Sequence, residues 1–205
     1  MNTLEIAREL QALAQSGLHF TEDVYDRERY ERLQTIACEM LADQSNQAVA
    51  DIFEWQKNDF GYATPKVDVR ALIIHNHQVL LVRENADMGR WTLPGGWADV
   101  NDTPSEAITR EVEEESGYQV RTKRLLAVLD REKHGHQPPY PYHIYKLFFE
   151  CQLIGGEAKP TMESSESGYF DPNDLPELSI SRVLPEQIQR LYQMSLLDTL
   201  QTWFD

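Results

Sequence analysis

Apolar residues recur over the first 60 positions at the spacing of one helical face and then change to a shorter period. The first helix carries Leu4, Ile6, Leu10 and Leu13 and is expected to end at Gly17, because glycine favours the position just after a helix. Two more helices are expected, from Thr21 and after Ser45, with apolar faces that contain Leu33, Ile36, Ala37, Met40 and Leu41, and Val49, Ile52 and Phe53.

From Lys66 onward the apolar positions alternate, as they do in strands. Strands are expected at 66–74, 79–82, 91–93, 125–130, 142–153 and 168–170, and helices at 103–117 and from Pro185 to about Gln201. The segment 58–65 interrupts both patterns and predicts a domain boundary. We therefore expect a helical domain over 1–60 and an α/β domain over 61–205.

The charge of the chain limits its partners. It has 34 acidic and 19 basic residues, a formal net charge of −15, and a surface of that sign repels nucleic acid and anionic membrane. Residues 1–60 alone hold twelve acidic and five basic side chains, a net charge of −7, so no DNA binding is expected of the helical domain. A phosphorylated small substrate would also be repelled, so any phosphate chemistry is expected to depend on a metal ion.

Other sequence features bear on location. No run approaches the roughly 18 apolar residues of a membrane span, and the first residues lack the pattern of a signal peptide. The two cysteines, Cys38 and Cys151, lie far apart and predict no disulfide framework. A cytoplasmic protein without a membrane partner is expected.

The helix expected at 103–117 carries an unfavourable set of charges. Glu111, Glu114 and Glu115 have the i, i+3, i+4 spacing of one face, where like charges cost about 0.2–0.5 kcal/mol per pair. A solvated acidic face is the alternative, but it predicts basic partners along the helix, and Arg110 is the only basic residue there. A cluster of carboxylate oxygens suits Mg²⁺ or Mn²⁺, and a divalent ion would reverse the repulsion.

The same segment resembles a known motif. Gly96, five residues, Asp102, seven residues and then Arg-Glu-Val-Glu-Glu-Glu-Ser-Gly-Tyr at 110–118 resemble the Nudix box. Asp102 departs from the glutamate of the motif and is one methylene shorter, which bears on support of the metal shell. Asn101 stands where many members have glycine; since asparagine tolerates left-handed backbone, the loop is expected to form.

This resemblance implies a Nudix α/β/α sandwich with a mixed sheet, preceded by an N-terminal all-helical domain. It implies that Glu111, Glu114, Glu115 and the backbone carbonyl of Gly95 bind Mg²⁺ or Mn²⁺. It also implies that Arg110 orients the carboxylates; the alternative for Arg110 is an ordinary surface ion pair.

A general base in this family is often a glutamate of the box or of a later loop. The loop expected before 168–170 contains Glu166 and Glu163, and we expect Glu166 to serve as an additional ligand or base, with Glu163 second. The alternative is a solvated acidic loop.

The segments 17–20, 24–30, 61–70 and 91–99 resemble a bacterial Nudix subgroup with an extra N-terminal helical domain. Its members are often named ADP-ribose pyrophosphatases, and some resemble CDP-choline pyrophosphatases. On this resemblance Arg70, Tyr25 and Phe20 are expected to bind substrate, because aromatic faces suit a quaternary ammonium such as choline. The alternative is that the aromatic residues pack the helical domain.

The expected function is therefore metal-dependent hydrolysis of a nucleoside diphosphate linked to another group, with CDP-choline first and ADP-ribose second. Two alternatives stay open: a nucleotide-binding sensor or regulator with little catalysis, and a housecleaning nucleoside triphosphate pyrophosphatase. A homodimer is expected, since three amphipathic helices form a small core and a second copy would cover their remaining apolar surface.

Overall fold

A computed structural model describes the chain except for residues 1, 46, 58, 60 and 198–200. The chain divides into two compact units, each considered by itself below. One consists of residues 1–66 together with 137–143, and the other of residues 67–136 together with 144–205. No helix in the described part of the chain combines the length and apolar character that crossing a membrane requires.

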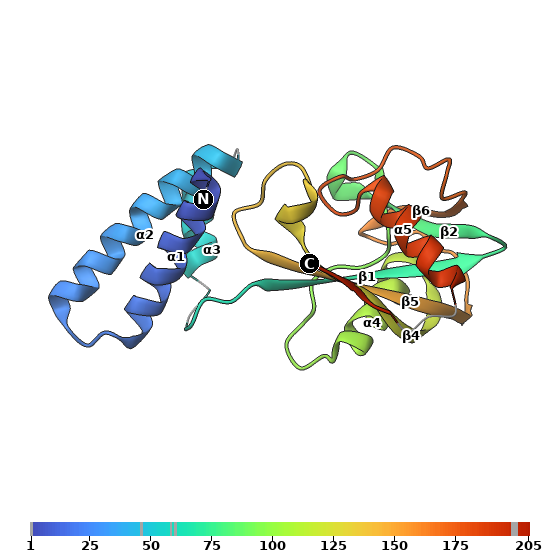
Figure 1. The fold of residues 1–205 in the computed structure, drawn as a ribbon, viewed down its shortest axis with the longest axis horizontal. Coiled ribbons are helices and arrows are strands. Elements are labelled where there is room, and N and C mark those ends of the chain that lie inside the picture. The colour runs from blue at the N-terminus through green and yellow to red at the C-terminus, as the bar shows by residue number, and fades with distance from the viewer. Residues whose placement is uncertain (1, 46, 58, 60, 198–200) are drawn as a thin grey trace. The chain divides into compact units, whose positions relative to one another are not determined.

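The first unit contains three helices, α1 (Thr3–Phe20), α2 (Val24–Ser45) and α3 (Val49–Lys57), shown in blue and cyan in Figure 1. Asn2 and Glu5 form a capping box at the start of α1. The three helices meet in a small core of Leu4, Ala7, Cys38, Leu41, Ala42 and Ile52. Residues 137–143 belong to this unit, where the Trp55 and Tyr142 rings lie 5.6 Å apart.

The first helix differs from the prediction at Gly17, which lies inside α1 and does not end it. A Cβ atom at this position would lie 2.4 Å from the Tyr30 ring, so glycine allows α1 and α2 to approach closely here. The helix ends at Phe20, and the N–H of Thr21 donates to the Gly17 carbonyl at 2.9 Å. Its buried face includes Ala7 and Ala14, whereas Leu13 is exposed.

The second unit is built on a sheet whose strand order is β3-β2-β1-β5-β4-β7, with β6 paired to β2. The strands are β1 (Lys66–His75), β2 (Gln78–Glu84), β3 (Arg90–Thr92), β4 (Tyr118–Asp130), β5 (Ile144–Gly156), β6 (Ser164–Phe170) and β7 (Trp203–Phe204). The helices are α4 (Pro104–Ser116) and α5 (Pro185–Leu196), with short 3₁₀ turns at Asn85–Asp87 and Arg131–His134. The sheet is mixed, because β7 runs parallel to β4 while β4 and β5 are antiparallel.

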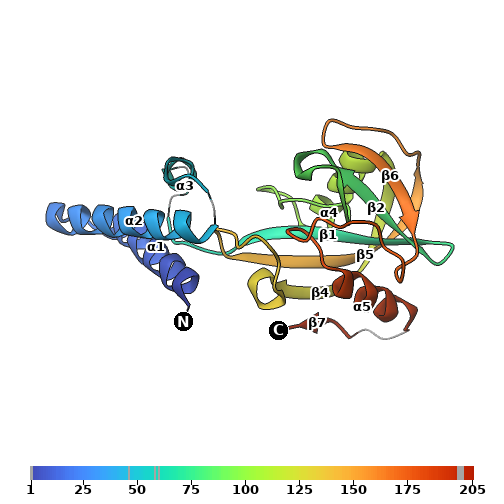
Figure 2. The same ribbon diagram turned by 90° about the horizontal axis from the view of Figure 1, so that it is seen from above.

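Helices α4 and α5 cover opposite faces of this sheet, as Figure 2 shows. The core on the α5 side includes Leu72, Leu81, Phe148, Ile188 and Leu191. The core on the α4 side includes Val69, Ala71, Ile73, Leu80, Ile108 and Val112. Alternate residues of β1 thus point to opposite cores, as the pleat of a strand requires, and the predicted α/β/α sandwich is confirmed.

Several predicted boundaries are corrected. Strand β4 begins at Tyr118, directly after the C-cap Gly117 of α4, and pairs with β5 from Tyr118 to Asp130 with three register shifts. Strand β6 begins at Ser164 and includes residues assigned from the sequence to a loop. The last helix ends at Leu196; its predicted continuation toward Gln201 crosses residues 198–200, outside the described residues. The predicted break at 58–65 likewise includes residues 58 and 60, which are not described.

Strand β7 was not predicted. Trp203 and Phe204 pair with Ala127 and Val128 of β4. The Arg190 guanidinium lies 3.8 Å from the centre of the Trp203 ring. The N–H of Asp130 donates to the Asp205 carboxylate at 2.7 Å, so the end of the chain is attached along β4.

Candidate functional site

Helix α4 positions the predicted acidic residues. As predicted, Thr103 and Glu106 form a capping box at its start, and Gly117 ends it in the left-handed conformation at φ 77°. Packing of Ile108 and Val112 against the sheet sets the rotation of the helix. This rotation buries two of the three box glutamates, as we call Glu111, Glu114 and Glu115. Glu111 is 8% and Glu115 4% exposed, whereas the side chain of Glu114 is 57% exposed.

A glycine turn lies against these buried carboxylates. The Pro94 and Gly96 carbonyls accept hydrogen bonds from β1, so the turn runs along the edge of that strand. Gly95 has φ 139°, and a Cβ atom on it would lie 2.0 Å from a β1 carbonyl oxygen. A Cβ atom on Gly96 would lie 2.6 Å from Glu111 Oε2, and the Gly95 N–H donates to Glu115 Oε2 at 2.8 Å. The turn therefore contacts both buried box glutamates.

Arg110 gathers acidic side chains from the loop before α4 and from the helix itself. Its guanidinium lies 3.2 Å from Asp99, 3.0 Å from Asp102, 2.8 Å from Glu111 and 2.9 Å from Glu114. The alternative of one ordinary surface pair does not describe this arrangement. Asn101 has φ 78°, which confirms that the departure from glycine still allows the loop to form.

The two buried box glutamates differ electrostatically from exposed carboxylates. Burial raises the pKa of Glu115 to about 8; Arg70 and the Gly95 N–H oppose the rise, and the Glu111 and Glu84 carboxylates add to it. Burial also raises the pKa of Glu111, against the effect of Arg110. Among the described residues, Glu115 thus forms no ion pair, although the charge of the nearby Arg70 acts on it.

The residues present fit a divalent cation. Within the part of the chain that the structure describes, no three His, Cys, Asp or Glu side chains converge as a complete metal cluster. Mg²⁺, however, is commonly held by one or two carboxylates and completes its shell with water and substrate phosphate oxygens. Glu111 and Glu115 supply two such carboxylates. They lie beside a glycine turn in which a Cβ atom on Gly96 would obstruct Glu111.

Arg70, expected from the sequence to bind substrate, lies in the interior at 4% exposure. Its guanidinium donates to both carboxylate oxygens of Asp68, at 3.1 and 2.8 Å, and to the Leu93 carbonyl at 3.1 Å. Asp68 also accepts from Lys146 Nζ at 2.5 Å. Arg70 is therefore held by protein groups and differs from the expected ligand-facing arginine.

Of the hydrogen bonds and ion pairs between described residues, none joins Glu166 or Glu163 to a box glutamate. Glu166 lies in strand β6, and its ion pair in the described part of the chain is with Arg83 at 3.6 Å. Arg83 and Glu166 lie where the pairing of β2 with β6 shifts register, between Val82 and Glu84. Glu163 is exposed just before β6.

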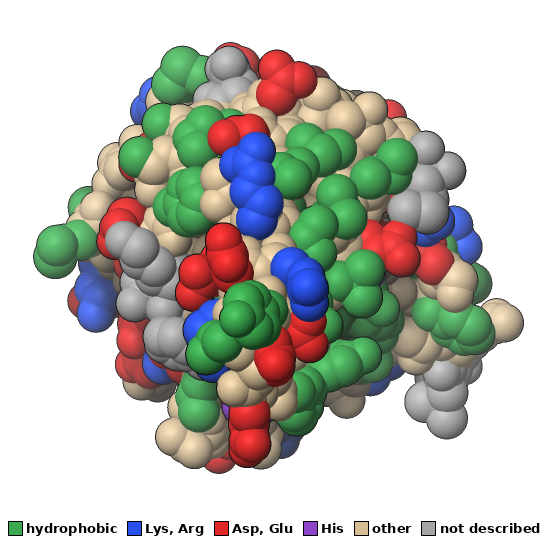
Figure 3. Space-filling view, turned by 90° about the vertical axis from the view of Figure 1, so that its left-hand side faces the viewer, with side chains coloured by type: hydrophobic (Ala, Val, Ile, Leu, Met, Phe, Trp, Pro, Cys, Tyr) green, Lys and Arg blue, Asp and Glu red, His purple; other side chains and the backbone are tan. Residues whose placement is uncertain are grey.

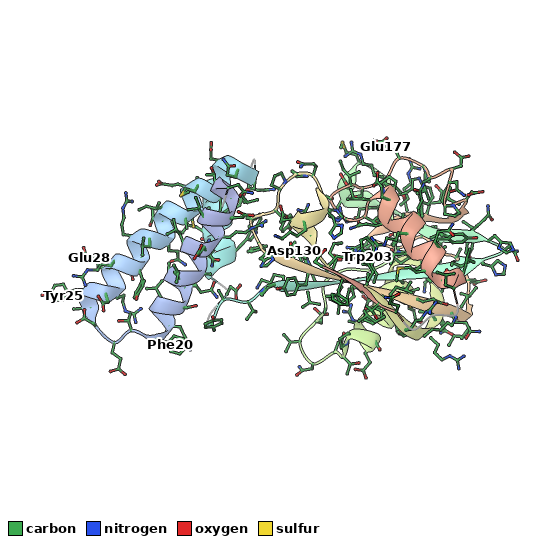
Figure 4. The ribbon with its side chains drawn as sticks, in the orientation of Figure 1. Phe20, Tyr25, Glu28, Asp130, Glu177 and Trp203 are labelled. Atoms are coloured by element: carbon green, nitrogen blue, oxygen red, sulfur yellow. The ribbon has the colours of Figure 1, made fainter. Side chains whose placement is uncertain are left out.

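Phe20 and Tyr25 lie where the α1–α2 hairpin turns, at the end of the helical unit (Figure 4). They are 69% and 67% exposed, so they do not pack the helical core, which was the alternative to a binding role.

Sequence reasoning missed Asp68, Lys146 and Glu84, all of which are buried and surround the site. A signal existed for Asp68, because a charged pair, Asp68 and Arg70, interrupts an otherwise apolar strand. Lys146 carried no comparable signal, since its contact with Asp68 spans 78 positions.

Comparisons with known proteins bear on both units. Residues 1–55 match the family described as a UDP-X-like, N-terminal oligomerisation domain, and residues 64–191 match the NUDIX domain. A protein of Bacillus subtilis (strain 168), provisionally named an ADP-ribose pyrophosphatase, is 43% identical over 202 residues, which are 98% of this chain and 96% of the relative.

Two crystal structures are also similar. A UDP-X diphosphatase is 35% identical with a TM-score of 0.65, and the match covers 100% of both chains. An ADP-ribose pyrophosphatase from Streptococcus suis 89-1591 is 38% identical with a TM-score of 0.63, over 69% of this chain and 100% of its own.

Proposed function

Because this chain belongs to the Nudix family of hydrolases, we propose that it cleaves the diphosphate bond of a nucleoside diphosphate linked to a second group. The products would be a nucleoside monophosphate and the phosphorylated second group. The observation that carries the proposal is the contact of Glu111 and Glu115, both buried, with the Gly95–Gly96 turn.

Nudix hydrolases generally use divalent metal ions, and we infer that Mg²⁺ or Mn²⁺ serves here. Glu111, Glu115 and the Gly95 carbonyl would hold the ion, with Glu114 beside them. When bound, the ion would polarise a phosphoryl oxygen, lower the pKa of the attacking water and offset the negative charge of the chain.

The residues around the box would orient these donors. Arg110 contacts Glu111 and Glu114 at once, which fixes two carboxylates that would otherwise repel each other. Asp102 reaches Arg110 at 3.0 Å, so the shorter side chain still supports the arginine. Glu114 is exposed enough to meet water and is our first candidate for accepting its proton. Glu166, the base suggested by the sequence, is the second.

The class of substrate is better supported than its identity. The names of two relatives favour ADP-ribose, and that of a third favours a UDP-linked compound. CDP-choline rests on the sequence argument, to which the exposure of Phe20 and Tyr25 adds two accessible aromatic faces.

We also propose that the helical unit forms a homodimer. Its match to an oligomerisation domain supports this. So do the exposed apolar side chains of Leu13 and Val24, both more than half accessible. Figure 3 views the molecule from the left-hand side of Figure 1 and shows hydrophobic side chains at the surface among charged ones. Light scattering at micromolar concentration should give the mass of a dimer, and a monodisperse monomer would contradict the proposal.

A substrate panel tests the activity. Metal-stripped protein is given Mg²⁺ or Mn²⁺ with ADP-ribose, UDP-sugars, CDP-choline or deoxynucleoside triphosphates, and the products are identified. We expect a nucleoside monophosphate from at least one diphosphate substrate, with kcat/KM above that for every triphosphate. Triphosphates cleaved to pyrophosphate about tenfold more efficiently would instead identify a housecleaning enzyme. Tight binding without turnover would identify a sensor.

A further inference from the structure

A buried ion pair lies directly behind the Gly95–Gly96 turn. Asp68 and Arg70 are two residues apart on β1 and are 6% and 4% exposed. The Asp68 carboxylate accepts from Nε and Nη2 of Arg70, and the Leu93 carbonyl accepts from Nη1. Each guanidinium nitrogen thus has a protein partner, and none of these partners is a box glutamate.

The box glutamates are nevertheless close to Arg70. The Arg70 Cα atom lies 2.9 Å from the position that a Gly95 Cβ atom would take, and the Gly95 N–H binds Glu115. Burial opposes the charge of Arg70, but Asp68, followed by Glu115 and Glu111, raises the pKa of the guanidinium. Arg70 therefore lies in the field of both buried carboxylates while it is paired with Asp68.

If the Arg70 guanidinium were released from Asp68, it would be attracted to the carboxylate of Glu115. Arginine binds carboxylates in bidentate geometry, and a buried carboxylate without a partner is costly. An Arg70–Glu115 pair would occupy the oxygen donors and place a positive charge where a divalent ion must bind.

We propose that Asp68 is a positioning residue for the metal site. It holds the Arg70 guanidinium back, so that Glu111 and Glu115 stay open to a divalent ion. This inference rests on the proposed function, because it takes the box glutamates as the ligands.

Lys146 provides a matched control within the same ion network. Its ammonium binds Asp68 at 2.5 Å and is 2% exposed, so its burial is comparable to that of Arg70. Replacing it with methionine disturbs the network but leaves the pair of Asp68 with Arg70. If Mn²⁺ binding depends on general packing of this network, Lys146→Met should weaken it as Asp68→Asn does. If it depends on the release of Arg70 from Asp68, Lys146→Met should leave it unchanged.

The test is direct binding of Mn²⁺ to metal-stripped, full-length protein, followed by the electron paramagnetic resonance signal of free Mn²⁺. Circular dichroism confirms that each variant is folded. We expect Asp68→Asn to weaken binding roughly tenfold or more, a size typical of coupling between neighbouring charges. The double variant Asp68→Asn, Arg70→Gln should regain most of the affinity, and Lys146→Met should bind at least as tightly as wild type.

Two outcomes overturn the inference: a folded Asp68→Asn variant that binds Mn²⁺ like wild type, or weakened binding that Arg70→Gln does not rescue. If Asp68→Asn does not fold, the single variant Arg70→Gln decides. It should bind Mn²⁺ at least as tightly as wild type, and weaker binding overturns the inference.

Comparing Mn²⁺ binding by wild type and Glu115→Gln shows whether the positioning role of Asp68 is wrong or the proposed metal site itself is wrong. Loss of binding in Glu115→Gln with no change in Asp68→Asn rejects only the positioning role. Equal binding by wild type and Glu115→Gln rejects the site itself.

Discussion

Two arginines lie near the box glutamates in contrasting surroundings. Arg110 is about 29% exposed and lies within ion-pair distance of four carboxylates, including Glu111 and Glu114. Arg70 is buried and, among the described residues, forms its ion pair with Asp68 alone. The same type of side chain therefore gathers donors at the surface and is kept from them in the interior.

The difference shows how burial changes the consequence of a lost contact. A solvated ion pair contributes about 0–1 kcal/mol to stability, because water screens it. Breaking a buried pair costs about 3–5 kcal/mol, because it leaves a charge without a partner. Damage to the Arg110 cluster should therefore leave stability nearly unchanged, whereas damage to the Arg70 cluster should lower stability.

The largest effect is expected at Glu115, the box glutamate that accepts a hydrogen bond from the Gly95 N–H. Glu115→Gln should lower kcat roughly a hundredfold or more, since even the residues that support metal ligands cost about 10–100-fold when removed. Stability of the metal-free protein at neutral pH should not fall, because burial raises the pKa of Glu115 to about 8 and the amide replaces a carboxyl that is already largely uncharged. Steady-state kinetics and urea unfolding measure the two quantities.

Glu113→Gln is the matched control for this variant. Glu113 lies on the same helix but is exposed, and its side chain accepts a hydrogen bond from Gln119 at 3.3 Å. Its kcat should stay near wild type. Equal losses in the two variants would show that total helix charge matters rather than the buried position.

The second prediction contrasts the acidic partners of the two arginines. Asp68→Asn should lower the free energy of unfolding by about 3–5 kcal/mol, because Arg70 and Lys146 both lose their buried counterion. Asp102→Asn should change it by at most about 1 kcal/mol but lower kcat about 10–100-fold through Arg110. Urea unfolding and kinetics on both variants check this, and equal destabilisation would abolish the distinction.

A third prediction concerns the buried imidazole of His136 and the loss of stability at low pH that its burial causes. His136 is 1% exposed; its Nδ1 lies 2.9 Å from the Ile180 carbonyl and its Nε2 lies 3.1 Å from the Gln187 amide nitrogen. Burial, with Lys146 and Arg131 nearby, lowers the pKa of His136 to about 3. Since the unfolded chain takes up this proton near pH 6.5, stability is lost as the pH falls from 6.5 toward 3.

At pH 5 this loss should be about 2 kcal/mol relative to neutral pH. His136→Asn should remove that share of the pH dependence, as measured by urea unfolding at pH 7, 6 and 5. His77→Asn, in an exposed turn, is the control. A His136→Asn variant with the same pH profile as wild type would show that this imidazole becomes charged without cost.

The smallest effect is expected at Glu166. Its pair with Arg83 spans 3.6 Å and both side chains are about half exposed, so Glu166→Gln should alter stability by at most about 1 kcal/mol. Its kcat should change far less than the roughly 10²–10⁴-fold contributed by a general base. A loss in kcat as large as that of Glu115→Gln would instead make Glu166 the base, as the sequence suggested.

Features encoded by neighbouring residues could be predicted from the sequence. Thr103, Glu106 and Gly117 define the ends of α4 through local hydrogen bonds and backbone conformation, and the structure has those ends. The contacts of Arg110 with Glu111 and Glu114 follow from helical spacing. These features need no knowledge of the remainder of the fold.

Features that depend on tertiary contacts could not be predicted. Glycine is typical of the position just after a helix, but Gly17 lies inside α1, where the ring of Tyr30 packs against it. Arg70 resembles a ligand-binding residue until its partner is known, and the strand pairing that buries it also brings Lys146 to Asp68.

Strand β7 affects whether the sheet edge at β4 can pair with a strand of another molecule. An uncovered sheet edge offers a row of free backbone groups on which a strand of another molecule can add, which is a route to aggregation. Here the tail of the chain pairs with β4 and occupies part of that row. The covering strand spans only two residues, and the charged Asp205 follows it, so it is a poor template for further strands. Growth of the sheet from molecule to molecule is thus discouraged at this edge by residues 203–205.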